Sequence, residues 1–190
     1  MVRYKQEHKA QTREDILRAA ARMFRTRGYS GVGIDAIMQE VGLTRGGFYN
    51  HFKSKEDLFT EVLRWDKDFV VRMKARDEKS LGSEGIQIAK DYLEPKHRTA
   101  VGPNCVLTTL TPDVVRAGDD ASEAFTDTVQ SLVREFERGL GDARQDDDRA
   151  LVAVALCVGG LLLARGTDGT QLANKISKAC QRAVERELTS

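Results

Sequence analysis

The chain has 190 residues, of which 41% are hydrophobic and only 6% aromatic, and it contains three prolines. This length allows one or two compact domains, and the low aromatic and proline content favours long helices over a strand-rich sandwich. The formal net charge is +1, yet residues 1–55 hold eleven Lys or Arg and five acidic residues, so this part carries +6 and the remainder −5. The asymmetry predicts a polyanionic partner for the basic part. A chance imbalance over a solvated helix face is the alternative.

Several classes of protein are disfavoured by the sequence. The cysteines at 105, 157 and 180 are odd in number and widely spaced, so we expect neither a disulfide framework nor a metal site, and no cofactor. The glycine spacing in residues 31–36 matches a dinucleotide-binding fingerprint, but these residues follow a predicted helix, whereas the fingerprint follows a strand. Because no nucleophile and base converge, we predict that the protein is not an enzyme.

Neither a signal peptide nor a membrane span is expected. The N-terminus is polar and charged, without an apolar signal-peptide core. The longest apolar run, 150–164, has about 15 residues, whereas about 20 are needed to cross a bilayer. This run therefore predicts a buried helix in a cytoplasmic protein without a membrane partner.

Helix-start and helix-stop residues define the first two predicted helices. Thr12 and Asp15 form a capping-box pattern that predicts the start of the first helix, and Gly28 predicts its end. The second is predicted over 34–41, where apolar residues repeat at helical spacing. Gly42 then permits the left-handed turn that ends such a helix.

Two more helix starts follow at once. Thr44 predicts the start of a very short helix over 45–51, and Ser54 that of a long one over 54–78. Helix, tight glycine turn and short helix form the layout of a helix-turn-helix DNA reader. The short helix is too small to form a core of its own, so we infer that it is presented to a partner.

The remainder of the chain is also predicted to be helical. Amphipathic helices are expected over 84–93, 120–140 and 170–188, and an apolar, buried helix over 149–165. All three prolines fall within 94–112, which predicts irregular backbone there.

Residues 12–59 resemble the N-terminal signature of the TetR family of transcriptional regulators. The resemblance is carried by four stretches: 28–29, 34–37, 41–52 and 54–58. The chain departs from the common pattern at Val32 and Gly33, where family members often have a Thr or Ser that touches a phosphate.

The resemblance implies an all-α fold and a regulatory function. A three-helix DNA-binding domain over 1–55 would be joined by helix 54–78 to a helical effector-binding and dimerisation domain over 56–190. We therefore expect a sequence-specific regulator, in the first place a repressor released from DNA by a small molecule. The alternatives are a DNA-binding regulator that answers oxidants or electrophiles through Cys105, and one that needs no ligand.

The short helix supplies the predicted DNA contacts. The free backbone amides of its first turn can bind phosphate. Arg45 in that turn can donate two parallel hydrogen bonds to guanine or to two phosphate oxygens. The resemblance implies phosphate contacts by Tyr49, His51 and Lys55 and base contacts by Asn50 or Arg45, whereas Phe48 and Phe52 are expected to pack inward. The predicted set is Thr44, Arg45, Gly46, Gly47, Tyr49, Asn50, His51 and Lys55. Arg3, Lys5 and Lys9 form either a minor-groove arm or an untethered basic tail.

The second part is predicted to dimerise and to hold the effector. Double-stranded DNA with a near-palindromic operator would match a homodimer with two-fold symmetry. The predicted dimer residues are Leu156, Gly159, Gly160, Leu162, Ile176 and Ala183, with burial inside one monomer as the alternative. The predicted effector-site residues are Trp65, Phe69, Leu107, Leu110, Phe125 and Val129, with plain core packing as the alternative.

Cys105 is the cysteine with a possible sensing role. It follows Gly-Pro-Asn and is predicted to begin a helix, where free amides and the helix dipole favour a thiolate. A small residue filling a helix start is the alternative. Cys157 and Cys180 fall on apolar helix faces and are expected to be inert.

Overall fold

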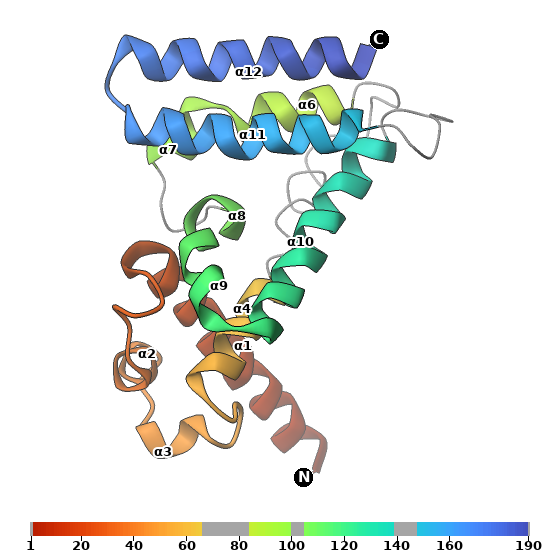
Figure 1. Cartoon of the computed structure of the whole chain (residues 1–190). Helices are drawn as coiled ribbons and strands as arrows, with labels where there is room; N and C mark the ends of the chain where they lie inside the picture. The colour runs from red at the N-terminus through yellow and green to blue at the C-terminus, as the bar shows by residue number, and fades with distance from the viewer. Residues whose placement is uncertain (1, 66–83, 100–104, 139–147, 190) are drawn as a thin grey trace.

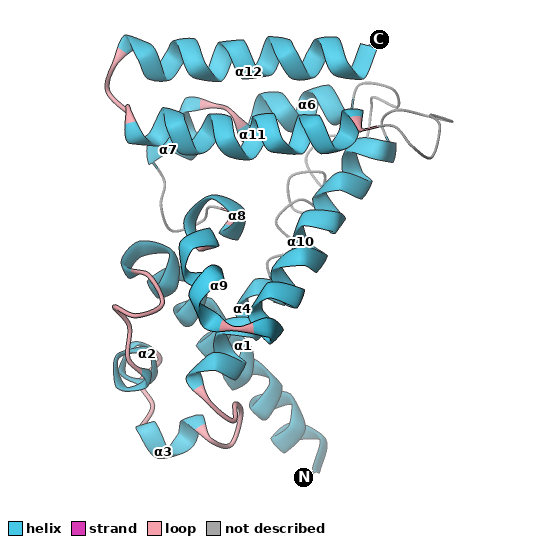
Figure 2. Cartoon of the chain, in the orientation of Figure 1, coloured by secondary structure: helices cyan, strands magenta, loops and turns pink. Residues whose placement is uncertain are grey.

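The computed structural model describes residues 2–65, 84–99, 105–138 and 148–189, and every regular element within these ranges is a helix (Figures 1 and 2). The predicted all-α class is confirmed. The helices are α1 (Val2–Arg27), α2 (Ile34–Glu40), α3 (Arg45–Phe48), α4 (Lys55–Trp65), α6 (Glu84–Tyr92), α7 (Pro95–Thr99), α8 (Val106–Thr109), α9 (Thr111–Ala117), α10 (Asp119–Arg138), α11 (Arg149–Gly166) and α12 (Gln171–Thr189).

The helices form two regions. In Figure 1, α1 to α4 lie at the bottom, α11 and α12 lie side by side at the top, and α10 runs between the two regions. α10 packs on α4 below and on α11 above. The Thr128 hydroxyl donates to the carbonyl oxygen of Leu63 at 3.1 Å, which ties α10 to α4 inside the core.

The first region is held by a compact aromatic and aliphatic core. Phe24, Phe48 and Phe59 are fully buried, and the rings of Phe24 and Phe59 meet edge to face at 5.5 Å between centroids. Tyr29 packs on the Phe59 ring at 4.8 Å. The helices α2 and α3, of 7 and 4 residues, are too short to be stable alone, so their positions depend on this shared core.

The first helix begins earlier than predicted. It starts at Val2, and Thr12 lies in its interior, where its hydroxyl donates to the His8 carbonyl oxygen at 2.9 Å. The residues before Thr12 include strong helix formers, which outweigh the capping signal. The predicted stop is confirmed, because Gly28 has φ +71° and its N–H bonds the Phe24 carbonyl oxygen at 2.8 Å.

The predicted start of α4 is confirmed by its hydrogen bonds. The Asp57 N–H donates to the Ser54 hydroxyl at 3.1 Å, and the Asp57 carboxylate accepts the Lys53 N–H at 2.8 Å. The helix is described as far as Trp65. Its predicted continuation to residue 78, including Phe69, lies outside the described residues.

The expectation of irregular backbone over 94–112 was wrong for the described part of that segment. Three short helices, α7, α8 and α9, occupy it. Pro95 begins α7 and Pro112 lies in the first turn of α9. The missing N–H of proline costs nothing in a first turn, so here proline starts helices instead of breaking them.

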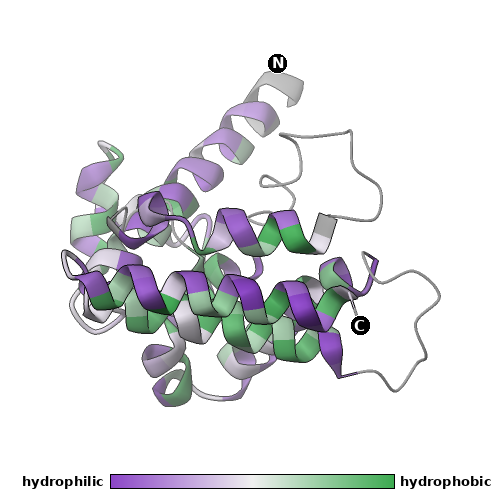
Figure 3. Ribbon diagram, turned by 90° about the horizontal axis from the view of Figure 1, so that it is seen from above, coloured by the Kyte–Doolittle hydropathy of each residue, from purple (hydrophilic) through white to green (hydrophobic). Residues whose placement is uncertain are grey.

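Among the described helices of nine or more residues, α11 is the most apolar. By length and composition alone it could cross a membrane, but a core helix passes the same test, and 39% of it is buried within this chain. It packs against α12, α10, α6, α7 and α8. Seen from above, hydrophobic positions run along α11 and α12 where the two helices lie side by side (Figure 3). These contacts favour a core helix, as predicted.

Gly160 allows α11 and α12 to approach closely within one chain. A Cβ at this position would lie 2.7 Å from Cys180 Sγ, 3.1 Å from Cys180 Cβ and 3.2 Å from Leu93 Cδ2. The structure therefore places this glycine inside the monomer, against its predicted role between two monomers. Gly159, in contrast, has open space beside it.

We expect Gly160→Ala to destabilise the chain relative to Gly166→Ala. Both substitutions remove a glycine from α11, but a Cβ at Gly166 meets nothing within 4 Å. The gain in helix propensity is shared, so the free energies of unfolding should differ by about 1–3 kcal/mol, the usual cost of overpacking. Urea unfolding measures this difference, and equal stabilities would contradict the packing.

Candidate nucleic-acid interface

A tight turn joins α2 to α3. Gly42 has φ +71°, and the Leu43 N–H bonds the Met38 carbonyl oxygen at 2.8 Å, which ends α2 as predicted. α3 is shorter than the predicted 45–51, because it ends at Phe48. Beyond it, the His51 N–H bonds back to the Phe48 carbonyl oxygen at 2.9 Å, three residues earlier, so the chain continues in tighter turns.

Two aromatic side chains fix which way α3 faces. Phe48 is fully buried and Phe52 is 2% exposed, so the predicted inward packing is confirmed. The Tyr49 ring meets the Phe48 ring edge to face at 5.3 Å, yet Tyr49 is 56% exposed. The remaining predicted contact residues divide by exposure: Thr44, Arg45, Gly46 and Asn50 are exposed, whereas Gly47, His51 and Lys55 are half-buried.

Thr44 occupies the N-cap position of α3, as predicted, but its side chain makes no capping hydrogen bond. Its backbone is extended at φ −85° and ψ 155°. The exposed hydroxyl and the first-turn amides of α3 therefore point to a site where an external acceptor, such as a phosphate oxygen, fits.

Arg45 is held by an acidic residue of the preceding helix. Its Nη1 donates to Asp35 Oδ2 at 3.0 Å. A hydrogen bond with Tyr49 and the charge of Asp35 raise the pKa of the Arg45 guanidinium. Sequence reasoning missed Asp35, since the two residues are ten positions apart and meet only through the turn at Gly42.

Lys55 lies on an aromatic ring at the start of α4. Its Nζ is 4.1 Å from the centroid of the Tyr29 ring, and the Tyr29 hydroxyl donates to Glu56 Oε1 at 2.8 Å. Burial lowers the pKa of Lys55, while Glu56 and Asp113 act in the opposite direction. The Tyr29 ring and the carboxylates of Glu56 and Asp113 restrict where the Lys55 ammonium group lies. Tyr29, like Asp35, is not among the DNA-contact residues predicted from the sequence.

His51 adjoins the basic side of α1. Its Nδ1 is buried without a hydrogen-bond partner in the described part of the chain. Burial and the charges of Lys9 and Arg13 lower the pKa of His51, which favours the neutral imidazole. Lys9 lies on helix α1, so for that residue the structure replaces the predicted arm or tail with a helix.

We expect Lys55→Ala to weaken binding to all DNA sequences alike. A lysine that contacts phosphate contributes affinity without reading bases, and its loss should flatten the slope of log affinity against log salt by about 0.9 per lost phosphate contact. Fluorescence anisotropy over a salt series measures the slope. Lys90→Ala, an exposed lysine on α6, is the control and should leave it unchanged.

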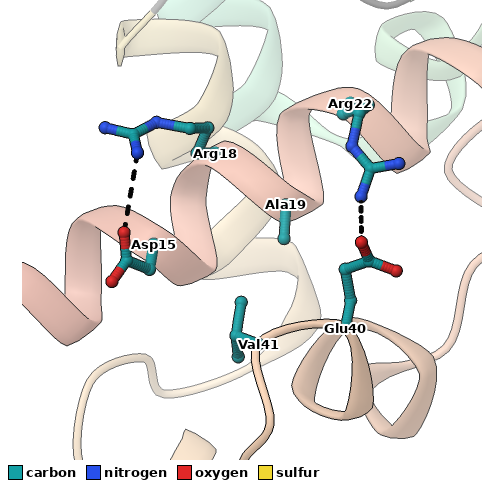
Figure 4. Close-up of a pocket in the computed structure, with 6 residues that line it drawn as sticks. All are labelled: Asp15, Arg18, Ala19, Arg22, Glu40 and Val41. Atoms are coloured by element: carbon teal, nitrogen blue, oxygen red, sulfur yellow. Dashed lines mark hydrogen bonds and ion pairs between the residues drawn. The ribbon is translucent and has the colours of Figure 1, made fainter.

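A shallow open groove lies between α1 and the end of α2 (Figure 4). Its lining residues are Asp15, Arg18, Ala19, Arg22, Glu40 and Val41. The ion pair between Arg22 and Glu40 crosses the groove from α1 to α2. A second pair, between Arg18 and Asp15, lies along α1 at its border. The groove contains none of the predicted effector-site residues, and its charged groups are already paired.

Within the described residues, the predicted effector-site residues come from three helices and from the junction between α8 and α9. Leu107 on α8 is buried, as is Leu110 at the junction of α8 and α9. Trp65 on α4 and Phe125 and Val129 on α10 are half-buried and pack against the core. Their neighbourhood also contains Arg165 of α11, whose guanidinium donates to Thr108 Oγ1 at 2.7 Å and to the His97 carbonyl oxygen at 3.0 Å.

Cys105 stands at the N-cap of α8, so its predicted place at a helix start is confirmed. Its side chain is nevertheless only 3% exposed. Cys157 is fully buried, and burial raises the pKa of its thiol; Cys180 is half-buried with its pKa raised in the same way. A raised pKa favours the protonated form of both thiols, which is less reactive than the thiolate.

The outer faces of α11 and α12 carry exposed apolar side chains. Leu151, Leu162, Leu163 and Leu172 are 51%, 54%, 62% and 53% exposed. Four other predicted dimer residues, Leu156, Gly159, Ile176 and Ala183, are half-buried. Several large exposed apolar side chains on two helices that pack together are typical of a protein interface.

The sequence is similar to known regulators. Residues 16–62 match the family model described as bacterial regulatory proteins, tetR family. The chain is 30% identical over 165 residues to the HTH-type transcriptional regulator LmrA of Bacillus subtilis, covering 80% of this chain and 86% of that protein. It is 28% identical over 93 residues to AcrR of Shigella flexneri, covering 49% of this chain and 43% of that protein, less than half its length.

Solved structures share the whole fold. A TetR-family regulator from Rhodococcus sp. matches with a TM-score of 0.77 at 16% identity, covering 94% of this chain and 99% of that one. A regulator from Saccharomonospora viridis, in complex with choline, matches with a TM-score of 0.68 at 19% identity, covering 93% and 96%. The fold and the helix-turn-helix motif define a DNA-binding transcriptional regulator. The chain belongs to the TetR family.

Proposed function

We propose that this protein is a homodimeric repressor that binds a near-palindromic operator through α3 and leaves it when a small molecule binds the second domain. The observation that carries the proposal is the orientation of α3. Phe48 and Phe52 anchor one side of it, and Arg45, Tyr49 and Asn50 are exposed together. We place the DNA-binding domain at 1–55 and the effector-binding and dimerisation domain at 56–190.

Each exposed group has a proposed role. Arg45 and Asn50 read base edges in the major groove, because a guanidinium pairs with guanine and an amide with adenine. Thr44, Tyr49, His51 and Lys55 bind phosphates, which positions the domain without reading sequence. Gly46 and Gly47 keep the backbone close to the groove, at about 1 kcal/mol each in helix propensity.

The proposed dimer uses the exposed apolar faces of α11 and α12. Leu162 and Leu163 on α11 and Leu172 on α12 would be buried against a second copy. A two-fold axis there pairs two α3 helices, and DNA readers of this kind bind half-sites about one helical turn apart.

Contacts between the two regions offer a route for release. Asp113 on α9 lies against the end of α1, with its carboxylate 3.6 Å from where a Cβ of Gly28 would stand, and it acts on the charge of Lys55. An effector that moves α8 and α9 would therefore disturb a proposed phosphate contact and lower the population of the DNA-binding state. The choline complex of the Saccharomonospora viridis protein supports a small-molecule site in this fold.

The proposed release is tested by ligand screening on the DNA complex. Quaternary amines, starting with choline, and a panel of apolar compounds are added while melting temperature and operator affinity are measured. We expect at least one compound to raise the melting temperature and to lower the operator affinity. If none changes either quantity, the ligand-responsive part of the proposal is wrong.

The second candidate function is a regulator that needs no small-molecule effector. Release through modification of Cys105 is one form, favoured by its place at the N-cap of α8 beside Tyr92. Burial of the thiol argues against it. Wild type and Cys105→Ser are compared during titration with a mild electrophile, and a thiol sensor requires DNA release from the wild type alone.

A further inference from the structure

An ion pair connects Asp35, which is not among the proposed DNA contacts, with Arg45, which is. It joins the first turn of α2 to the first residue of α3 across the turn at Gly42. Both side chains are largely exposed, at 68% for Asp35 and 60% for Arg45. Exposed pairs contribute little to stability, so this contact adds little to holding the fold together.

We propose that Asp35 is a specificity-determining residue that positions the Arg45 guanidinium for a base pair in the operator, without touching the DNA. The inference rests on the proposed role of α3 and deepens it. Asp35 is a positioning residue, since it acts only through Arg45.

The geometry leaves the guanidinium able to read a base. Asp35 Oδ2 accepts one N–H from Nη1 at 3.0 Å. An arginine has five N–H donors, and the hydrogen bond with Tyr49 uses a second one. Three donors remain, and a bidentate contact with guanine needs two of them. Restricting the long side chain before binding reduces the rotamer entropy that is lost when it meets the base.

The charge of Asp35 works against non-specific binding. A carboxylate beside the groove-reading residue repels phosphates within a region that carries +6. The loss of this repulsion on Asp35→Asn should strengthen binding to arbitrary DNA. The same substitution should weaken discrimination, because Arg45 becomes free to contact phosphates or other bases. The proposal therefore predicts that Asp35→Asn binds arbitrary DNA more strongly and discriminates between DNA sequences less well.

Glu40 provides a matched control on the same helix. It lies at the last residue of α2 and pairs with Arg22 of α1, at the groove shown in Figure 4. Glu40→Gln removes one negative charge from α2, as Asp35→Asn does, but leaves Arg45 and its partner intact. Any effect of net charge alone is therefore common to both variants.

The experiment combines in vitro selection from random duplex DNA with anisotropy titrations of the full-length protein. Wild type, Asp35→Asn, Glu40→Gln, Arg45→Ala and the double variant Asp35→Asn/Arg45→Ala are compared on the selected operator and on arbitrary DNA. We expect Asp35→Asn to lower the ratio of the two affinities about tenfold, with the loss concentrated at one base pair per half-site. In the Arg45→Ala background Asp35→Asn should cause no further loss of that ratio.

Several outcomes would overturn the inference. One is an Asp35→Asn variant with wild-type discrimination at every base pair while Arg45→Ala loses it. Another is an equal loss in Glu40→Gln, and a third is a further loss in the double variant. Melting temperatures show whether a variant is folded, and Asp35→Ala replaces Asp35→Asn if the latter is not. If the wild type selects no sequence, or Arg45→Ala discriminates as the wild type does, the proposed role of α3 fails instead.

Discussion

Arg45→Ala should lower affinity for the operator by about 5- to 150-fold for each half-site, because one bidentate arginine–guanine contact contributes about 1–3 kcal/mol of discrimination. The Arg45 side chain is 60% exposed, so the fold should survive its removal. Tyr49→Ala should have a similar effect through loss of a phosphate anchor, since its side chain is 56% exposed. Anisotropy titrations with operator and arbitrary DNA measure both variants.

The control for Arg45→Ala is Arg134→Ala, an exposed arginine on α10 at a distance along the chain from α3. It should leave operator affinity unchanged, and circular dichroism should be the same for all three variants. Operator affinity at the wild-type level in both Arg45→Ala and Tyr49→Ala would show that α3 is not the reading element.

Leu162→Glu should convert the protein into a monomer that binds the operator weakly. This leucine is 54% exposed on the outer face of α11, and burial of an unpaired carboxylate against a second copy is strongly unfavourable. Two half-sites bound by one dimer can exceed the affinity of one half-site by about 10²- to 10⁴-fold, and a monomer loses that gain. Light scattering and anisotropy measure the two effects.

Val115→Glu is the control for the dimer prediction. Val115 is 81% exposed on α9, away from the outer faces of α11 and α12, so the same charge there should change neither mass nor affinity. A Leu162→Glu protein that remains dimeric at micromolar concentration would place the interface elsewhere. A wild type that is already monomeric would remove the dimer from the proposal.

Much of the fold was predictable because helix boundaries and apolar faces are local properties. Gly28 and Gly42 end their helices with positive φ, and Ser54 caps α4, each as its residue type predicts. The amphipathic helix predicted over 120–140 is confirmed within the described residues as α10, where Leu132 and Phe136 are buried and Phe125 is half-buried. How deeply each residue of such a face is buried depends on neighbouring helices, which periodicity does not reveal.

The errors came from competition between signals. The spacing between Thr12 and Asp15 fits a capping box and so predicts a helix start, but the helix-forming residues before Thr12 extend α1 to Val2. Pro95 and Pro112 predict breaks in the backbone when read alone, but a proline in a first turn starts a helix. Gly160 looked like an interface glycine, but its close neighbour is Cys180 of its own chain.

The candidate site was predictable in its residues and less so in its contacts. The exposed set on α3 followed from two aromatic residues four apart, Phe48 and Phe52, which decide the buried side. Asp35 and Tyr29 were not selected, because each acts through a residue distant in sequence, Arg45 and Lys55. Contacts of that kind require the relative placement of α2, α3 and α4.

Hydroxyl-radical footprinting of the wild-type protein on its selected DNA tests the central claim most directly. Two α3 helices related by a two-fold axis should protect the backbone in two patches with dyad symmetry, centred about 10 base pairs apart and facing successive major grooves. Excess arbitrary DNA should not remove this protection. A uniform pattern along the duplex, or protection that arbitrary DNA competes away at equal concentration, would contradict sequence-specific recognition through α3.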